Sequence, residues 1–171
     1  MDVSALLSDA LTRVREQVPS LLDGLDEAAL TWRPGPGANT IGWIVWHMSR
    51  IQDDHIAEVA DEPQVWLEDG WEERFGLPFP PESHGYGHTP EEVGQVRGVS
   101  PDLLAGYYDE VAHRSLAYVS ELSPHDLDRI VDTRWDPPVT LGARLVSVVG
   151  EVHAHTGQAA YIRGLWENRD R

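Results

Sequence analysis

The chain has 171 residues, a length that fits one domain with a single core. It carries 29 acidic residues against 13 basic ones, which gives a formal net charge of -16. Because binding to nucleic-acid phosphates needs clustered positive charge, this balance argues against a nucleic-acid partner. We expect a single domain over residues 1–171.

Two residue types are missing from the sequence. With no Cys, the chain cannot form disulfides, a cysteine nucleophile or a zinc–thiolate site. All 13 basic residues are Arg, which excludes a catalytic or phosphate-binding lysine. The first residues lack a signal-peptide pattern, and no apolar run approaches the roughly 18 residues of a membrane span. We therefore expect a cytoplasmic protein without a membrane segment.

Apolar residues recur at helical spacing in four segments, at about residues 3–25, 40–60, 100–122 and 140–166. Pro19 should kink the last turns of the first segment. Asn39 or Thr40 can cap the second, and Ser100 followed by Pro101 is typical of a helix start. No convincing strand period is present, so the sequence predicts an all-α four-helix bundle.

A long crossover, at about residues 61–99, joins the second and third helices. The spacing of Thr89 and Glu92 is that of a capping box, which predicts a short helix inside it. A connection of this length is often a lid or a pocket wall. Alternatively, its Trp66, Trp71 and Phe75 simply cover one end of the core.

A short internal sequence repeat predicts two related helical hairpins. Seven residues recur in the same order before the second and the fourth helix, with unequal gaps. They are Leu25, Leu30, Trp32, Pro34, Thr40, Ile41 and Gly42, against Leu122, Leu127, Trp135, Pro137, Thr140, Leu141 and Gly142.

The fourth helix carries two candidate ligands on one face. His155 falls among apolar positions that should face the core, and Glu151 lies one turn earlier, about 40° around the helix. His153 lies about 160° away and should point outward. Since an isolated buried charge is costly, the pair needs a compensating partner.

His47 on the second helix supplies that partner if the second and fourth helices face each other. Two imidazoles and one carboxylate suit Zn²⁺, with Ni²⁺, Fe²⁺ and Mn²⁺ as alternatives. Three protein ligands leave a position at which a bound water or thiol loses its proton more readily. The competing interpretation is a Glu–His pair that bonds without metal.

Other polar residues are weaker candidates. Trp43 and Gln158 lie within about a turn of the proposed ligands and could line the cavity or orient a ligand. Asp54 lies two turns along the second helix and is a candidate acceptor around the site, although an exposed acid is the commoner outcome. His84 and His88 could bind metal, but their Gly-rich surroundings favour a solvated loop.

Two long segments, LTWRPGPGANTIGWIVWHMSRIQDDHIA and EVHAHTGQAAYIRGLWE, give the chain a resemblance to the DinB/YfiT-like superfamily. GWEERFGLP, GYGHTPEEV and LLAGYYDEV extend it across most of the chain. It resembles in particular an actinobacterial branch of unknown function related to mycothiol-dependent maleylpyruvate isomerase. The family's metal motif, a His on the second helix and two ligands one turn apart on the fourth, maps onto His47, Glu151 and His155. Many relatives have His at the position of Glu151, and the Glu form is similar to the isomerase.

The resemblance implies a DinB-like fold and a metal-dependent enzyme that uses a low-molecular-weight thiol such as mycothiol or bacillithiol. Metal coordination would hold the thiol as its thiolate, which could attack an electrophilic substrate in a transferase or isomerase reaction. The isomerase has an additional C-terminal domain without a counterpart in this sequence, so its specific reaction does not carry over. Two alternatives stay open: a non-catalytic ligand-binding or stress-related protein, and a metal-assisted hydrolase.

Glycines form a ridge on the fourth helix, opposite His155. Each Gly costs up to about 1 kcal/mol relative to Ala in a helix, so the ridge predicts close packing against another surface. That surface is either a second copy of the chain, in a homodimer, or the chain's own crossover. The ridge contains Gly142, Gly150, Gly157 and Gly164, with Ala160 nearby.

Overall fold

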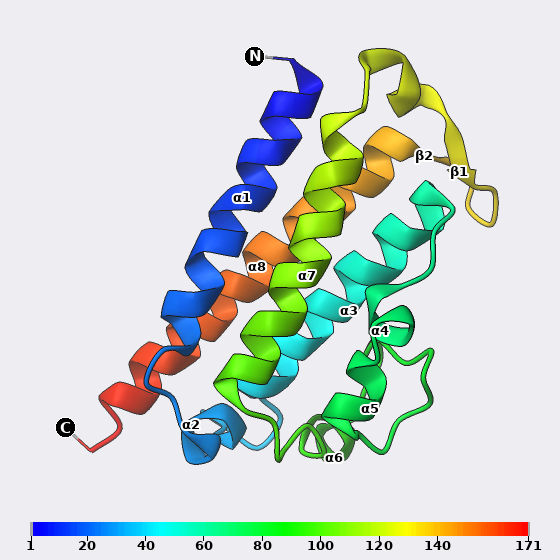
Figure 1. Ribbon diagram of the computed structural model, residues 1–171. Helices are drawn as coiled ribbons and strands as arrows, with labels where there is room; N and C mark the ends of the chain where they lie inside the picture. The colour runs from blue at the N-terminus through cyan, green and yellow to red at the C-terminus, as the bar shows by residue number, and fades with distance from the viewer. Residues whose placement is uncertain (1, 171) are drawn as a thin grey trace.

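The computed structural model describes residues 2–170. Four long helices form the body of the molecule (Figure 1). Each packs against two neighbours, in the cyclic order α1, α7, α3, α8. They are α1 (Val3–Leu22), α3 (Ile41–Ala60), α7 (Pro101–Ser120) and α8 (Leu141–Glu167). The predicted all-α four-helix bundle is confirmed.

Side-chain caps define where the four helices start. Asp2, Thr40, Ser100 and Thr140 each accept a hydrogen bond from a free backbone N–H of the first turn. The end of α1 differs from the prediction, which placed it near Leu25. The helix stops three residues earlier because the chain turns at residue 24, a Gly with φ of +71°.

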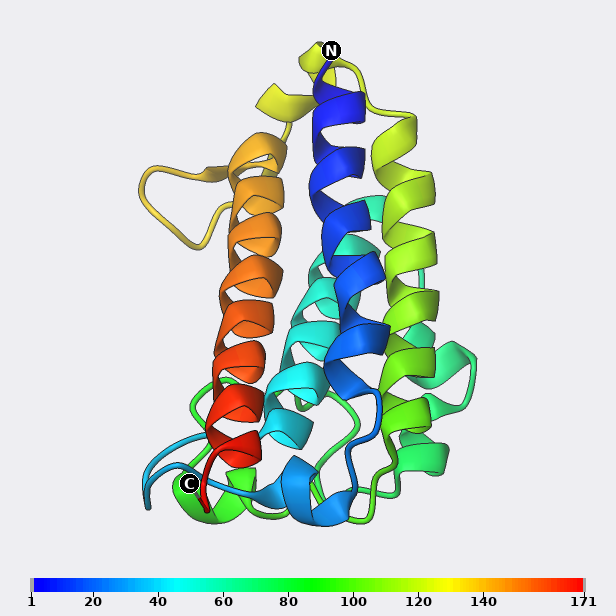
Figure 2. The same ribbon diagram turned by 90° about the vertical axis from the view of Figure 1, so that its left-hand side faces the viewer.

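Helix direction explains the long crossover. Helices α3 and α7 run the same way, antiparallel to α1 and α8, so the chain must return along the bundle before α7 begins (Figures 1 and 2). Three short helices lie in this return. They are α4 (Val65–Glu68), α5 (Trp71–Phe75) and α6 (Pro90–Val93). The predicted capping box of Thr89 and Glu92 is present at the start of α6.

Aromatic residues of the crossover cover one side of the core. Trp66, Trp71 and Phe75 are buried, and all three rings contact Tyr107 of α7. Gly106 of α7 gives the Trp71 ring room, since a Cβ there would lie 3.0 Å from it. This part of the crossover therefore performs the covering role that the sequence left open.

A small β-hairpin was missed by the sequence analysis. It consists of β1 (Ile130–Asp132) and β2 (Val139–Thr140), which pair antiparallel just before α8. A 3₁₀ helix (Pro124–Asp128) precedes it, and a short helix α2 (Glu27–Thr31) precedes α3. Strands of three and two residues are too short to show a period in the sequence.

The predicted internal repeat corresponds to the same backbone packing at the starts of α3 and α8. A Cβ on Gly42 would lie 3.2 Å from the carbonyl oxygen of Leu30, and one on Gly142 would lie 3.3 Å from that of Leu127. In both places a small residue lets the helix approach the preceding backbone closely.

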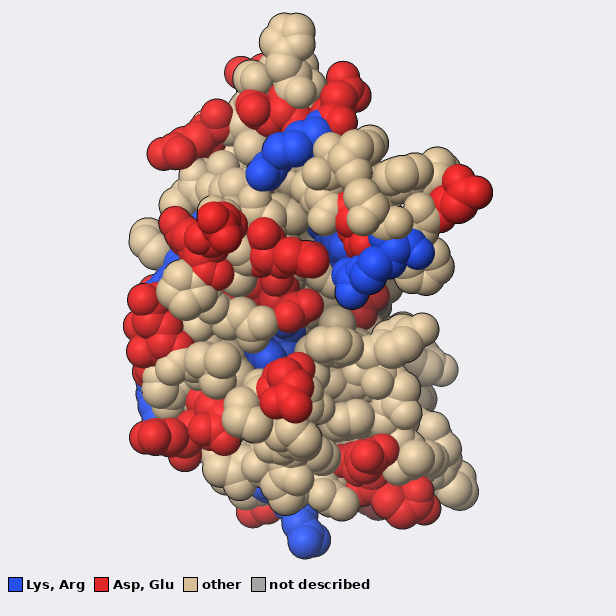
Figure 3. Space-filling view, turned by 90° about the vertical axis from the view of Figure 1, so that its right-hand side faces the viewer, with Lys and Arg blue, Asp and Glu red and all other residues tan. Residues whose placement is uncertain are grey.

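Helix α3 is the centre of the bundle, with 16 of its 20 residues buried. No helix in residues 2–170 combines the length and the hydrophobicity that a membrane span requires. On the face that carries the crossover, acidic side chains are scattered widely and basic ones are few (Figure 3).

Candidate metal centre

The packing of α3 against α8 brings His47, Glu151 and His155 together. Oε1 of Glu151 lies 3.2 Å from Nε2 of His47 and 2.9 Å from Nε2 of His155. One potential ligand atom from each of the three residues lies within 4.8 Å of the other two. The two helices thus face each other as the sequence analysis required, and the side-chain heads converge.

The three residues differ in their access to solvent. His47 is buried at 5% exposure, whereas Glu151 and His155 are half-buried. His153 is exposed, as predicted, and its Nε2 lies 3.1 Å from the carbonyl oxygen of Ala10. The cluster is therefore anchored in the core on the α3 side and reachable from solvent on the α8 side.

Hydrogen bonds fix the orientation of both imidazoles. Nδ1 of His47 contacts the carbonyl oxygen of His84, which can only accept, so this nitrogen carries the proton. Nδ1 of His155 lies 2.8 Å from Oε1 of Gln158 and donates to it in the same way. In the neutral imidazoles, both Nε2 lone pairs then point toward the Glu151 carboxylate.

This donor set fits a divalent cation. Two Nε2 lone pairs and a carboxylate oxygen repel one another unless something positive lies between them. A proton on each imidazole can meet that need, and so can a metal ion. Metal-binding histidines usually donate their other N–H to a carbonyl or an amide oxygen, as His47 and His155 do here.

The pKa values respond to the same contacts. With a proton on Nε2, His155 and His47 donate hydrogen bonds to Glu151 and hold its pKa far below its usual range. Burial alone would lower the pKa of His155, but the hydrogen bond and charge of Glu151, together with Gln158, raise it above its usual value. Without a cation, Glu151 is therefore ionised and draws a proton to His155.

Trp43 and Asp54 lie in different surroundings. The Trp43 ring stacks on His47, with centroids 4.5 Å apart, and meets the His155 ring edge to face. Asp54 accepts a hydrogen bond from Gln64 at 2.8 Å and lies 3.6 Å from His55. Trp43 thus flanks the cluster, while Asp54 contacts residues away from it.

The crossover also forms a wall of this site, which is one of the two interpretations that its length left open. The sequence suggested the imidazole of His84 as a possible ligand, yet the main-chain carbonyl of this residue contacts His47. His88 accepts a hydrogen bond at 3.2 Å from the Trp43 indole. Gly85 packs directly against His47, Trp43 and Trp46. The Gly-rich stretch SHGYGH favours a solvated loop, and this prediction is wrong, because Gly85 is buried and His84 and His88 are half-buried.

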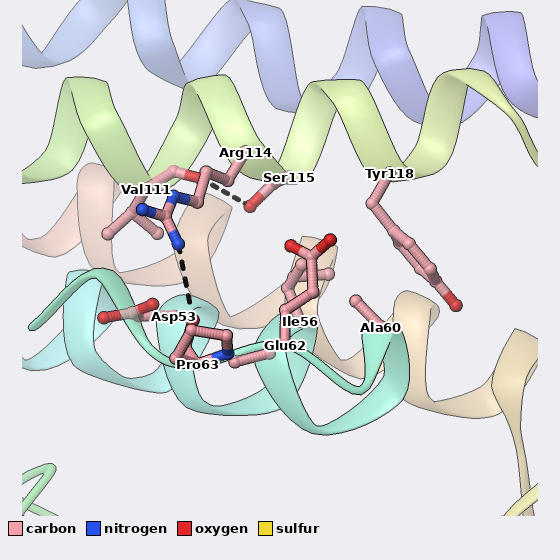
Figure 4. Close-up of a pocket in the computed structure, with 10 residues that line it drawn as sticks. Asp53, Ile56, Ala60, Glu62, Pro63, Val111, Arg114, Ser115 and Tyr118 are labelled. Atoms are coloured by element: carbon pink, nitrogen blue, oxygen red, sulfur yellow. Dashed lines mark hydrogen bonds between the residues drawn. The ribbon is translucent and has the colours of Figure 1, made fainter. Parts of the chain in front are cut away.

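A separate cavity lies between α3 and α7 (Figure 4). It is about 20 Å³ in volume, roughly the space of one water molecule. Asp53 and Ser115 line it, and Arg114 donates to the carbonyl oxygen of Pro63 at 3.4 Å beside it. Six positions from His47 on α3, Asp53 points about 120° away from the metal-site face, so this cavity is not part of that site.

The glycine ridge of α8 does not pack against the crossover, so that alternative is wrong. Gly142 lies against Leu127. A Cβ on Gly150, Gly157 or Gly164 would meet no atom within 4 Å. Gly150, Gly157 and Gly164 therefore form an open glycine strip on the surface of the described part of the chain.

These features define a helical bundle with a candidate metal centre between two of its long helices. The family model of the DinB superfamily matches residues 10–159, and the chain belongs to this superfamily. A crystal structure of a conserved protein from Enterococcus faecalis is similar over 96% of this chain and 97% of that one, with 32% sequence identity and a TM-score of 0.89. A comparison with the curated proteins finds no match.

Proposed function

We propose that this protein is a metal-dependent enzyme whose divalent cation is held by His47, Glu151 and His155. The observation that carries the proposal is the convergence of two oriented Nε2 atoms on one carboxylate oxygen, at 3.2 and 2.9 Å. Zn²⁺ suits this set best, with Ni²⁺, Fe²⁺ and Mn²⁺ as alternatives. Membership of the DinB superfamily supports the proposal, because the resemblance to this family implies metal ligands at these three positions.

We further propose that the second reactant is a low-molecular-weight thiol such as mycothiol or bacillithiol. A bound divalent cation lowers the pKa of a thiol or of water that coordinates to it. Because Glu151 contributes one negative charge and the two imidazoles none, a site holding a divalent ion keeps a net charge of +1. That charge favours an anionic fourth ligand such as a thiolate.

The residues around the centre support a reactive site that is accessible on one side. The buried Trp43 ring excludes water next to His47, while Gln158 and half-buried His155 lie toward solvent. A small thiol and an electrophile can therefore approach from the α8 side. The reaction class is the transfer of the thiol to an electrophilic carbon, or an isomerisation that begins with the same attack.

Metal analysis tests the first part of the proposal. Protein purified without a metal-affinity column should contain about one equivalent of a divalent ion per chain, and His155→Ala should contain almost none. The exposed His153→Ala, two residues away on the same helix, is the matched control and should keep the metal. Equal metal content in wild type and His155→Ala would contradict the assignment.

Cobalt substitution tests the second part. Addition of mycothiol to the cobalt-loaded protein should produce a sulfur-to-cobalt charge-transfer band, absent from His155→Ala. The loaded protein should also accelerate the attack of the thiol on an aryl chloride, in which a C–S bond forms, chloride leaves and the thiol proton passes to solvent. Metal uptake with no band and no acceleration would reject the thiol and favour a metal-assisted hydrolase. No metal uptake would favour the non-catalytic alternative.

We also propose that the open glycine strip of α8 forms a homodimer interface. Val146 and Tyr161, both 69% exposed, flank the strip with apolar surface. Two such helices can approach closely because Gly150 and Gly157 have no side chains. Light scattering should give twice the 19.1 kDa mass of one chain, and Gly157→Arg should give the mass of one. A single-chain mass for the wild type at micromolar concentration would reject the dimer.

A further inference from the structure

Part of the crossover lies directly against the candidate metal centre. The segment 81–88, with sequence PESHGYGH, follows α5 and contacts the N-terminal half of α3. Within it, the carbonyl oxygen of His84 contacts Nδ1 of His47. Gly85 is buried, while Gly87 is exposed. The segment thus reaches a proposed ligand through its main chain rather than through a side chain.

Three residues on one face of α3 hold this segment. Trp43, His47 and Arg50 are spaced by four and three residues, so their side chains lie in one row. Nε1 of Trp43 donates to Nδ1 of His88 at 3.2 Å. Nε of Arg50 donates to the carbonyl oxygen of Ser83 at 3.1 Å.

The burial of Arg50 makes its hydrogen bonds important for the position of the segment. Its side chain is wholly buried and also donates to the carbonyl oxygen of Pro81 at 3.3 Å and to Gln64 at 2.8 Å. Although Asp53 lies 3.5 Å away and balances its charge, a buried guanidinium that lost these acceptors would keep unsatisfied N–H groups, which is costly. The hydrogen bonds to residues 81 and 83 therefore hold the chain in place just before His84.

Gly85 permits the close approach to His47. Its φ of +89° lies in the region that favours glycine. A Cβ at this position would lie 2.9 Å from Nδ1 of His47 and 2.9 Å from the Trp46 ring. Because the indole is packed in the core and His47 is fixed by its own contacts, neither can retreat without disturbing the cluster.

We infer that His84 and Gly85 are positioning residues for the metal centre. The main-chain carbonyl of His84 holds the proton on Nδ1 of His47 and so presents Nε2 to the cation, and Gly85 allows this carbonyl to reach the ring. The inference rests on the proposed function, since it concerns the same site. Its consequence is reciprocal coupling: an ordered segment strengthens metal binding, and bound metal stabilises the segment.

Two glycine variants of the full chain test the inference. Gly85→Ala and Gly87→Ala change residues of the same segment with similar left-handed φ values, +89° and +78°. Only the first places a methyl group against His47, because a Cβ on Gly87 would meet no atom within 4 Å. The affinity for Zn²⁺, measured by competition with a chelator, should fall about 10-fold or more for Gly85→Ala relative to Gly87→Ala. Equal affinities of the two variants would overturn the inference.

Hydrogen exchange of the wild type provides a second test that does not depend on how Gly85→Ala folds. Addition of Zn²⁺ should slow the exchange of backbone amides in residues 84–88 more than in the start of α7, which lies away from His47. Metal binding with unchanged exchange in that segment would also overturn the inference. A wild type that binds no Zn²⁺ would instead reject the proposed function itself, so the two failures are distinguishable.

Discussion

Gln158 accepts a hydrogen bond from Nδ1 of His155 at 2.8 Å, one turn further along α8. This contact sets the tautomer that leaves Nε2 free for a cation. Gln158→Ala should therefore weaken Zn²⁺ binding by about 10-fold, at the low end of the usual range because Gln158 is exposed to solvent. Affinity can be measured by chelator competition.

Two further variants test whether Gln158→Ala weakens Zn²⁺ binding because His155 loses its orientation. Gln158→Glu keeps an acceptor oxygen and should bind Zn²⁺ at least as tightly as the wild type. Asp54→Ala removes an acid that the sequence suggested near the site and that the structure places against Gln64, so it should leave the affinity unchanged. An unaltered affinity for Gln158→Ala would show that Gln158 does not orient His155.

Asp53 is the polar anchor between α3 and the crossover. Its carboxylate accepts hydrogen bonds from the backbone of Val65 and Trp66 and from the hydroxyl of Tyr107, at 2.8 to 2.9 Å. Asp53→Ala leaves these buried donors and Arg50 without their partner. We expect a loss of about 3 kcal/mol or more in the free energy of unfolding, measured by urea denaturation.

The neighbouring acid is a suitable control for this loss. Asp54 is half-exposed and accepts one hydrogen bond, so Asp54→Ala should cost about 1 kcal/mol or less. Similar losses for the two variants would show that the burial of Asp53 does not determine its contribution.

Asp132 of the hairpin ties β1 to α8 and should make stability depend on pH. Hydrogen bonds from the side chain and backbone of Arg134, with the charges of Arg134 and Arg144, hold the pKa of Asp132 far below 3.8. A carboxylate with a lowered pKa in the folded state stabilises the protein above its ordinary pKa. This contribution is lost as the pH falls through the folded-state value.

Asp132→Asn should therefore lower the Tm most at pH 5 to 7, and the difference from wild type should shrink as the pH falls below about 4. Asp128→Asn, at an exposed position of the preceding 3₁₀ helix, measures the general effect of removing one negative charge nearby. A Tm difference for Asp132→Asn that stays constant from pH 7 to pH 3 would be inconsistent with the ion pairs seen here.

The long helices and the three converging residues could be predicted because the signals are local. Caps such as Thr40 and Ser100 mark where helices start, and the four-residue spacing puts Glu151 and His155 on one face. Adding His47 required one further assumption, that α3 and α8 face each other, which the apolar faces of both helices supported.

The contact of the His84 carbonyl and the surroundings of Asp54 could not be predicted from the types of side chain in the sequence. A carbonyl oxygen is present at every residue, so nothing in the sequence distinguishes that of His84. The azimuth of Asp54 matches that of His47, but seven residues of helix separate the two by about 10 Å. At that distance Asp54 finds its partner in Gln64 of the crossover, whose path depends on tertiary packing.

X-ray absorption at the zinc edge of the zinc-loaded protein tests the central claim most directly. Coordination through His47, Glu151 and His155 predicts two imidazole nitrogens and a carboxylate oxygen at about 2.0 to 2.2 Å, with one further light-atom or thiol ligand. The imidazole signal should fall by half in His47→Ala and in His155→Ala. An unchanged spectrum in both variants, or one without imidazole ligands in the wild type, would contradict the proposed metal centre.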